Sequence, residues 1–224
     1  MTVSLTRREA VLGWAYLLFQ LLFLPSLLSG INALLGTPLD AVWLYFLFFC
    51  INFLAVVLLL GRFGLENLRC IRWRGLILTA AAAFLIHWGS TYLVSLLIHQ
   101  RYPDFYNVND TSIYTMASRN FWPVAIGTVL LVPVAEELLY RGVFFGSLYC
   151  INRVFAYVVS ALFFALIHVV SYIGTYPADV LLLCLLQYVP PGLCLAWAYE
   201  RSGSILCPIL VHAAINAIGI FSVR

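Results

Sequence analysis

Six long apolar stretches without a single charged residue constrain this chain more than any other feature. A seventh segment, residues 120–150, is equally apolar but contains Glu136, Glu137 and Arg141. A spanning helix needs about 20 apolar residues. Strand-like alternation is absent, so we expect an all-α transmembrane bundle of seven or eight spans, a single integral membrane domain over residues 1–224. The six uncharged runs are residues 10–39, 41–61, 75–100, 154–178, 180–199 and 202–223.

Composition excludes an ordinary soluble protein. Charged residues make up 9% of the chain and hydrophobic residues 64%, whereas about a quarter of a soluble domain is charged. The 12 Arg are scattered and the net charge is only +3, which leaves no basic face for nucleic acid. We therefore expect the lipid bilayer as partner, and no nucleic acid. The six Cys have no paired spacing and are expected as small buried side chains.

The positions of Arg predict the orientation of the chain in the membrane. Nine of the 12 Arg fall on one expected side of the membrane. They precede the first span or lie in every second connection between spans, and Arg141 is counted in one of these connections. We expect a multi-pass protein of the plasma membrane with a cytoplasmic amino terminus and an outer carboxy terminus. The polar stretch 101–119 is expected as a soluble loop on the outer face.

Two carboxylates and an Arg lie inside the seventh segment, where a charge near the helix centre costs about 2.5–3.5 kcal/mol. Glu137 and Arg141 have the i,i+4 spacing of an ion pair. Adjacent helix positions point about 100° apart, so Glu136 is left unpaired and free to face a cavity. Pro133 weakens the backbone ladder nearby and can open a water pocket. The alternative is a structural salt bridge plus one acid at the cytoplasmic boundary.

Three further polar residues lie in later spans. A lone His such as His168 is more often an interhelical hydrogen-bonding group than a catalyst. His212 and Asn216 share one helical face. Together with Glu136, these residues could hold and deprotonate a water and donate to an oxyanion, if the helices bring them together. His87, with Thr91 and Ser95 at helical spacing, favours interhelical packing.

Other protease chemistries find no support in the sequence. No pair of intramembrane aspartates is available, and neither Gly-x-Ser-x-Gly nor Gly-x-Ser-Gly occurs. The His-Glu-x-x-His pattern of zinc proteases is also absent.

Three motifs occur in order on separate expected helices: Glu136-Glu137-x-x-x-Arg141-Gly142, Phe164-x-x-x-His168 and His212-x-x-x-Asn216. This set resembles the CAAX-protease and bacteriocin-processing (Abi, CPBP) family of intramembrane glutamic proteases. The resemblance covers residues 133–216, and we expect a motif-bearing catalytic core over about 120–223.

The resemblance implies proteolysis by an activated water, without a covalent acyl-enzyme and without a cofactor. By the resemblance, Glu136 is the general base and His168 its partner in orienting the water, while His212 and Asn216 form the oxyanion hole. Glu137 and Arg141, with Phe164 of the second motif, are supporting residues. A metal-dependent protease that uses Glu136, His168 and His212 is the alternative within the family; we expect no metal, because the second-shell carboxylates of a closed zinc site are missing.

The expected substrate is a membrane-associated peptide or protein. A second hypothesis is a non-proteolytic scaffold, or a bacteriocin self-immunity protein that keeps the motifs. A third is a small transporter with a protonatable Glu136; the internal repeat of many transporters is absent. On the simplest topology Glu136 lies nearer the cytoplasmic end of its helix than His168 does, unless residues 142–152 continue the helix or re-enter the membrane.

Overall fold

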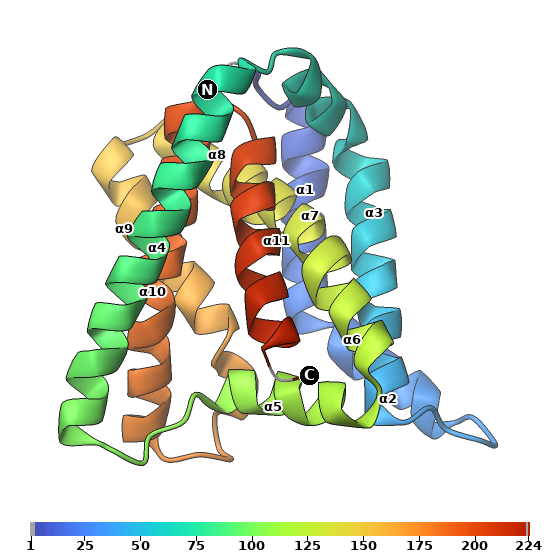
Figure 1. The fold of residues 1–224 in the computed structure, drawn as a ribbon. Coiled ribbons are helices and arrows are strands. Elements are labelled where there is room, and N and C mark those ends of the chain that lie inside the picture. Colours follow the sequence, from blue (N-terminus) through green and yellow to red (C-terminus); the bar gives the residue numbers. More distant parts are fainter. Residues whose placement is uncertain (1–2, 223) are drawn as a thin grey trace.

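The structure is a computed structural model that describes residues 3–222 and 224; Val223, the last residue of the expected core, lies outside the described residues. Within the described part the fold is all-α, as predicted (Figure 1). The elements are α1 (Arg7–Leu22), α2 (Leu24–Ala33), α3 (Ala41–Arg69), α4 (Trp73–Arg101), α5 (Val108–Arg119), α6 (Phe121–Ile126), η1 (Gly127–Leu131), α7 (Val132–Glu137), η2 (Leu138–Phe145), α8 (Gly146–Tyr149), α9 (Arg153–Ile167), η3 (Val170–Tyr172), α10 (Ala178–Ser202) and α11 (Leu206–Phe221).

Four helical stretches of the described chain are long and apolar enough to cross a membrane. They are Ala41–Arg69, Trp73–Arg101, Phe121–Tyr149 and Ala178–Ser202. The pair α1 and α2 passes the same test only together, with a bend of 49°, and would be a fifth span. Two expected spans correspond to shorter apolar helices, α9 and α11. Length and composition thus give four to five spans and do not show the expected seven or eight.

Local signals in the sequence fix several helix boundaries. The Thr6 side chain and Glu9 form a reciprocal capping box at the start of α1. Asp40 and Asn152 accept backbone N–H groups at the starts of α3 and α9. The α10 helix ends at Gly203, whose φ of 68° is a left-handed conformation that glycine adopts without strain.

One end of the bundle collects most of the Arg residues. Glu9 of α1 pairs with Arg62 of α3, Glu200 of α10 pairs with Arg153 of α9, and Asn67 of α3 accepts the N–H of Ile205 between α10 and α11. These contacts bring the starts of α1 and α9 and the ends of α3 and α10 together. The eight Arg at or beside this end are Arg7, Arg8, Arg62, Arg69, Arg72, Arg74, Arg153 and Arg201.

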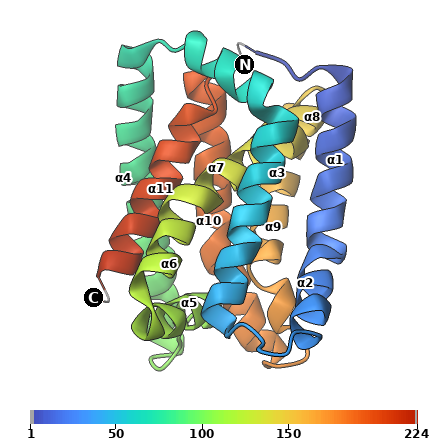
Figure 2. The same cartoon turned by 90° about the vertical axis from the view of Figure 1, so that its right-hand side faces the viewer.

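Two expectations about charged segments are wrong. Arg141 does not lie in a connection: it lies in η2, inside the helical stretch 121–149, with a side chain that is completely buried. The stretch 101–119 is not simply a loop, because it contains α5. Asn107 caps this helix, and α5 lies across the end of the bundle opposite the Arg-rich end (Figures 1 and 2).

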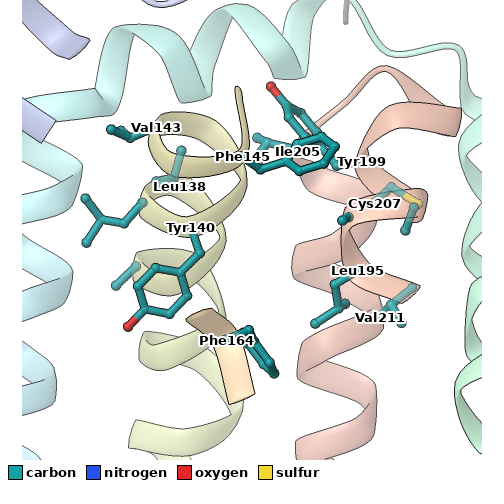
Figure 3. Packing of buried hydrophobic residues seen from close by; sticks show 14 of the residues in the cluster. Leu138, Tyr140, Val143, Phe145, Phe164, Leu195, Tyr199, Ile205, Cys207 and Val211 are labelled. Carbon is teal, nitrogen blue, oxygen red and sulfur yellow. The ribbon is translucent and has the colours of Figure 1, made fainter. Parts of the chain in front are cut away.

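The main core lies between η2, α9, α10 and α11. Figure 3 shows Phe164 of α9 between η2, which carries Leu138 and Tyr140, and the helices that carry Leu195 and Val211. The α9 and α10 helices approach very closely, because a Cβ on Gly192 would lie 2.9 Å from Cα of Ala161. The packed core thereby fixes the helices that carry the three motifs relative to one another.

Candidate active site

The first motif lies on an irregular helix. Residues 121–149 form one helical stretch in which two π-helical segments, η1 and η2, flank the short α7. Pro133 has no N–H to donate to the carbonyl four residues earlier, in η1. Wider π-helical turns are frequent at functional sites. Glu136 and Glu137 close α7, and Arg141 lies in η2.

Glu136 and His168 line the same cavity, and the helical stretch that carries Glu136 does continue through residues 142–149. Tyr149, at the end of that stretch, lies 13 residues after Glu136, and eight of these residues are π-helical. His168 follows the last residue of α9, which starts at Arg153 beside the same end of the bundle, and is therefore about 22 Å from it.

Glu137 binds two partners at once. Its Oε1 accepts from Nη1 of Arg141 at 3.0 Å and from Nδ1 of His212 at 2.8 Å. Glu137 and Arg141 are both fully buried, so the ion pair predicted from their spacing is present. The contact with His212 was not predicted. It links the first and third motifs through a carboxylate that lies behind the cavity wall.

Phe164 lies against the cationic end of this cluster. The guanidinium carbon of Arg141 is 4.5 Å from the centre of the Phe164 ring, within the range of a cation–π contact. Nη2 of Arg141 also donates to the carbonyl of Gly192 at 3.4 Å. Because Phe164 is 3% exposed and its ring also packs edge-on to His212, it separates the buried ion pair from the cavity.

Glu136 differs from its neighbour. Among the described residues, Oε2 of Glu136 and Oε2 of Glu137 are both buried without a hydrogen-bond partner. Glu137 is bound to two partners through its Oε1, whereas Glu136 lines a cavity. A buried carboxylate oxygen without a partner is costly, and native structures leave few such atoms unless a water, an ion or a catalytic role explains them. The structure therefore has the unpaired, cavity-facing carboxylate that the sequence predicts.

The tautomer of each motif His follows from its Nδ1 partner. Nδ1 of His168 lies 2.7 Å from the carbonyl oxygen of Phe164, which can only accept, so Nδ1 carries the proton. Nδ1 of His212 likewise lies 2.8 Å from Oε1 of Glu137, the oxygen that also accepts from Arg141, so Nδ1 is the nitrogen that donates. In both rings Nε2 is the nitrogen left for substrate or water.

Asn216 is anchored one turn beyond His212. Its Nδ2 donates to the carbonyl of Thr128 in η1 at 2.8 Å. That bond uses one of two amide hydrogens and leaves the second available. His212 and Asn216 both line the cavity, on the same face of α11.

A cavity of about 960 Å³ joins these groups. Its size is that of a site for a small peptide or drug-sized ligand. Of the predicted residues, Glu137 and Arg141 do not line it, since they lie behind the wall. Those that do line it are Glu136, Phe164, His168, His212 and Asn216.

Other lining residues were missed or interpreted differently from the sequence. His87, Thr91 and Ser95 line the cavity instead of serving only helix packing. Within the part of the chain that the structure describes, His87 Nδ1 and Thr91 Oγ1 are buried without hydrogen-bond partners. Their helical spacing was the available signal. Tyr188 also lines the cavity and stacks on His168 with ring centres 4.4 Å apart. No spacing rule connects residues on α9 and α10.

The donor set does not fit a bound metal. Among residues 3–222 and 224, no three His, Cys, Asp or Glu side chains lie close enough together to hold a metal ion. The set Glu136, His168 and His212 is therefore not arranged as a ligand cluster. The carboxylate of Glu137 on Nδ1 of His212 is, however, a partner of the second-shell kind that was expected from the sequence to be missing, so that reason for expecting no metal is wrong.

The arrangement has the parts needed to activate water. Glu136 offers a carboxylate oxygen with no protein partner, and the Nε2 of a neutral His168 can accept from a water. Asn216 can donate a hydrogen bond from α11 with its second amide hydrogen, and His212 can donate from Nε2 when its ring carries both protons. A serine or cysteine nucleophile is not needed for hydrolysis in such a site.

Part of the chain matches the model of a known protein family. Residues 118–218 match the family model described as type II CAAX prenyl endopeptidase Rce1-like. The matched region includes all seven predicted site residues, Glu136, Glu137, Arg141, Phe164, His168, His212 and Asn216. No solved structure shows a significant match to the chain.

Two curated proteins of Lactococcus lactis subsp. lactis (strain IL1403) are similar to parts of the chain. The UPF0177 protein YxdF is 30% identical over 90 residues, which are 40% of this chain and 44% of that protein. The UPF0177 protein YbdI is 26% identical over 132 residues, which are 56% of this chain and 66% of that protein. The matches thus cover less than two thirds of either relative.

Proposed function

We propose that the chain is an intramembrane endopeptidase that cleaves a membrane-associated peptide or protein with an activated water. The match of residues 118–218 to the Rce1-like type II CAAX prenyl endopeptidase model supports this proposal. One observation carries the proposal: Glu136 Oε2 is buried without a partner in the cavity that His168, His212 and Asn216 also line. The site is proposed to lie in a multi-pass protein of the plasma membrane.

In the proposed reaction, a water lies between Glu136 and Nε2 of His168. Glu136 takes a proton as the water oxygen attacks the scissile carbonyl carbon, and the carbonyl becomes a tetrahedral oxyanion. Collapse of this intermediate breaks the C–N bond, and Glu136 passes the proton to the leaving amine. The products are a new carboxyl terminus and a new amino terminus, with no covalent intermediate on the protein.

His212 has a specific requirement in this scheme. Its Nδ1–H already binds Glu137, so Nε2 can donate to the oxyanion only when the ring carries both protons. The Glu137 carboxylate stabilises that imidazolium directly. Asn216 supplies the second donor through its remaining amide hydrogen. Glu137, Arg141 and Phe164 support the reaction by holding His212 in place.

The test compares new peptide termini in cells that carry the wild type or Glu136→Gln at equal membrane abundance. Glu66→Gln is the matched control, since Glu66 lies on α3 away from the cavity. We expect termini that are present with wild type and Glu66→Gln and absent with Glu136→Gln. Identical profiles in all three, with the host phenotype preserved, would refute proteolysis and favour a scaffold or bacteriocin self-immunity protein that keeps the motifs.

A further inference from the structure

We propose that α5, the helix across the outer end of the bundle, positions His168 through Tyr188. The inference rests on the proposed function, because it concerns the ring that would orient the catalytic water. Tyr188 acts in it as a positioning residue and α5 as the element that holds Tyr188. Among the described residues, the hydrogen bond and ring contacts of His168 go to Phe164 and Tyr188 and not to α5.

The His168 ring is held on its faces by aromatic rings. Tyr188 stacks on it with centres 4.4 Å apart and planes 23° apart, and Phe164 lies 4.6 Å away. The Nδ1 bond to the Phe164 carbonyl fixes one edge of the ring. Phe164 lies on α9 and His168 directly follows that helix. The stack on Tyr188 is therefore the ring contact that joins the imidazole to another helix, α10.

The Tyr188 hydroxyl is in turn fixed by the first turn of α5. It donates to Oδ1 of Asp110 at 2.7 Å and accepts from Nδ2 of Asn109 at 2.9 Å. Tyr188 lies just before Pro190 and Pro191, which cannot donate backbone hydrogen bonds within α10. This part of α10 therefore depends more than a regular helix does on contacts with its neighbours.

Asn107 completes the attachment. Its Oδ1 accepts the backbone N–H groups of Asn109 and Asp110 and so starts α5, while its Nδ2 donates to Oε1 of Gln187 at 2.9 Å. The start of α5 is thus bonded to two successive residues of α10. A displacement of α5 from the bundle end would break these bonds and release the Tyr188 ring.

A series of contacts thus connects α5, at the expected outer end of the bundle, to the imidazole ring of His168. It runs from Asp110 and Asn109 to the Tyr188 hydroxyl, through the rigid phenol ring, and across the stack to His168. The α5 helix also borders the cavity, since Asn107, Asn109 and Asp110 line it. A group that enters the cavity from this end meets α5 before it reaches His168.

The experiment follows the His168 ring in the full chain, labelled with ¹³C-histidine in detergent micelles. A stacked phenol ring shields the imidazole protons, so the His168 signal, identified by its loss in His168→Gln, is expected upfield. Tyr188→Leu should move it downfield, whereas Tyr188→Phe should keep the shielding but broaden the signal as the ring loses its anchor. Asp110→Ala should resemble Tyr188→Phe, and Asp110→Asn, which keeps an acceptor, should resemble wild type.

Activity supplies the second readout, with the peptide whose termini the wild type generates as substrate. We expect Tyr188→Leu to lower kcat by about 10²-fold, as misplacement of a catalytic group does, with little change in KM. Tyr106→Phe is the matched control, since that residue is 75% exposed and lies outside the network.

An unchanged His168 signal in both Tyr188→Leu and Asp110→Ala would overturn the inference, whatever the activity. If the His168 signals move as expected but the wild type generates no new peptide termini, the proposed function is refuted, whereas the positioning of the His168 ring by α5 is supported. Should Tyr188→Leu not fold, Tyr188→Phe and Asp110→Ala decide the question, because neither removes packed ring volume.

Discussion

At the scale of single residues, Glu136 and Glu137 are chemically identical neighbours with opposite surroundings. Successive helix positions point about 100° apart, so one carboxylate faces the cavity and the other faces Arg141 and His212. Removal of the Glu136 charge should therefore affect the chemistry, and removal of the Glu137 charge should affect the stability of the fold.

Glu137→Gln should destabilise the fold. Arg141 is completely buried and would lose its only carboxylate partner among the described residues, and breaking a buried pair by removing one partner costs about 3–5 kcal/mol. Reversible unfolding in mixed micelles measures the loss. Glu136→Gln, which removes no ion-pair partner, should unfold close to wild type.

The double variant Glu137→Gln/Arg141→Met is the control for the buried charge. It removes both charges and keeps an apolar chain in the place of the guanidinium stem, so much of the lost stability should return. If Glu137→Gln alone is as stable as wild type, the pair is not a structural requirement of the bundle.

The residue pattern predicts this site in part. The spacing of Glu137 and Arg141 is local, and it predicts an ion pair that the structure contains. The bond between Glu137 and His212 joins residues 75 positions apart, and no spacing rule reaches that far. The catalytic roles carried over from the family resemblance remain predictions for Glu136, His168, His212 and Asn216.

At the scale of elements, α9 and α10 touch where Gly192 meets Ala161. Gly192→Ala would place a Cβ 2.9 Å from Cα of Ala161 and 3.1 Å from its carbonyl oxygen. Backbone atoms cannot move aside as a side chain can, so the two helices must separate. Overpacking of this kind costs about 1–3 kcal/mol, which unfolding in micelles detects.

Gly89→Ala on α4 is the matched control for that substitution. No atom lies within 4 Å of the position of its added Cβ, and Ala is favoured over Gly inside a helix by about 0.5–1 kcal/mol. Equal stability of the two variants would show that α9 and α10 can separate without cost.

The α5 helix should make stability depend on pH through Asp110. Burial raises the pKa of Asp110, against the opposing effect of the Tyr188 hydroxyl bond. The folded state thus holds a proton that the unfolded state releases above the ordinary value of about 4. Stability contributed by the neutral acid is full below that value and is lost as pH rises through the raised pKa.

Asp110→Asn tests this dependence, because its side chain does not titrate. The titratable groups that face Asp110 are Tyr114 on α5, Tyr172 on η3, and Tyr188 and Cys184 on α10. All of these ordinarily titrate above pH 8. Relative to Asp110→Asn, the wild type should lose stability from about pH 4 upward, and parallel curves for the two proteins would contradict the assignment.

The elements could be predicted where the hydrophobic pattern is strong. The long apolar runs gave α3, α4, α10 and the stretch 121–149 as helices. The polar stretch 101–119 offers no such pattern, and α5 forms there because Asn107 caps it and α10 binds its first turn. The π-helical turns around Glu136 depend on packing around Pro133, which periodicity does not record.

At the scale of the whole molecule, the two ends of the bundle differ in charge. Eight Arg lie at or beside one end, and Arg101, Arg119 and Arg224 belong to the other. Since the excess of Arg marks the cytoplasmic side, the end that carries the start of α1 should face the cytoplasm. The buried Arg141 contributes nothing to this bias.

Labelling of cysteines tests the orientation. Cys70 and Cys150 are free and exposed, and they follow α3 and α8 at the Arg-rich end. A membrane-impermeant maleimide should modify them in inside-out vesicles and not in intact cells. Ser118→Cys, placed on exposed α5 in a Cys70→Ser/Cys150→Ser background, should show the reverse. Labelling of Cys70 in intact cells would invert the assigned topology.

The shortness of α9 has a consequence for the surrounding membrane. Its 15 residues rise about 22 Å, against a hydrocarbon layer of about 30 Å. If α9 crosses the bilayer, the lipid must become thinner around it to relieve this hydrophobic mismatch. We then expect lipid headgroups and their hydration water to lie closer to the end of α9, where His168 lies, and this water would be the second reactant of a membrane-embedded hydrolase.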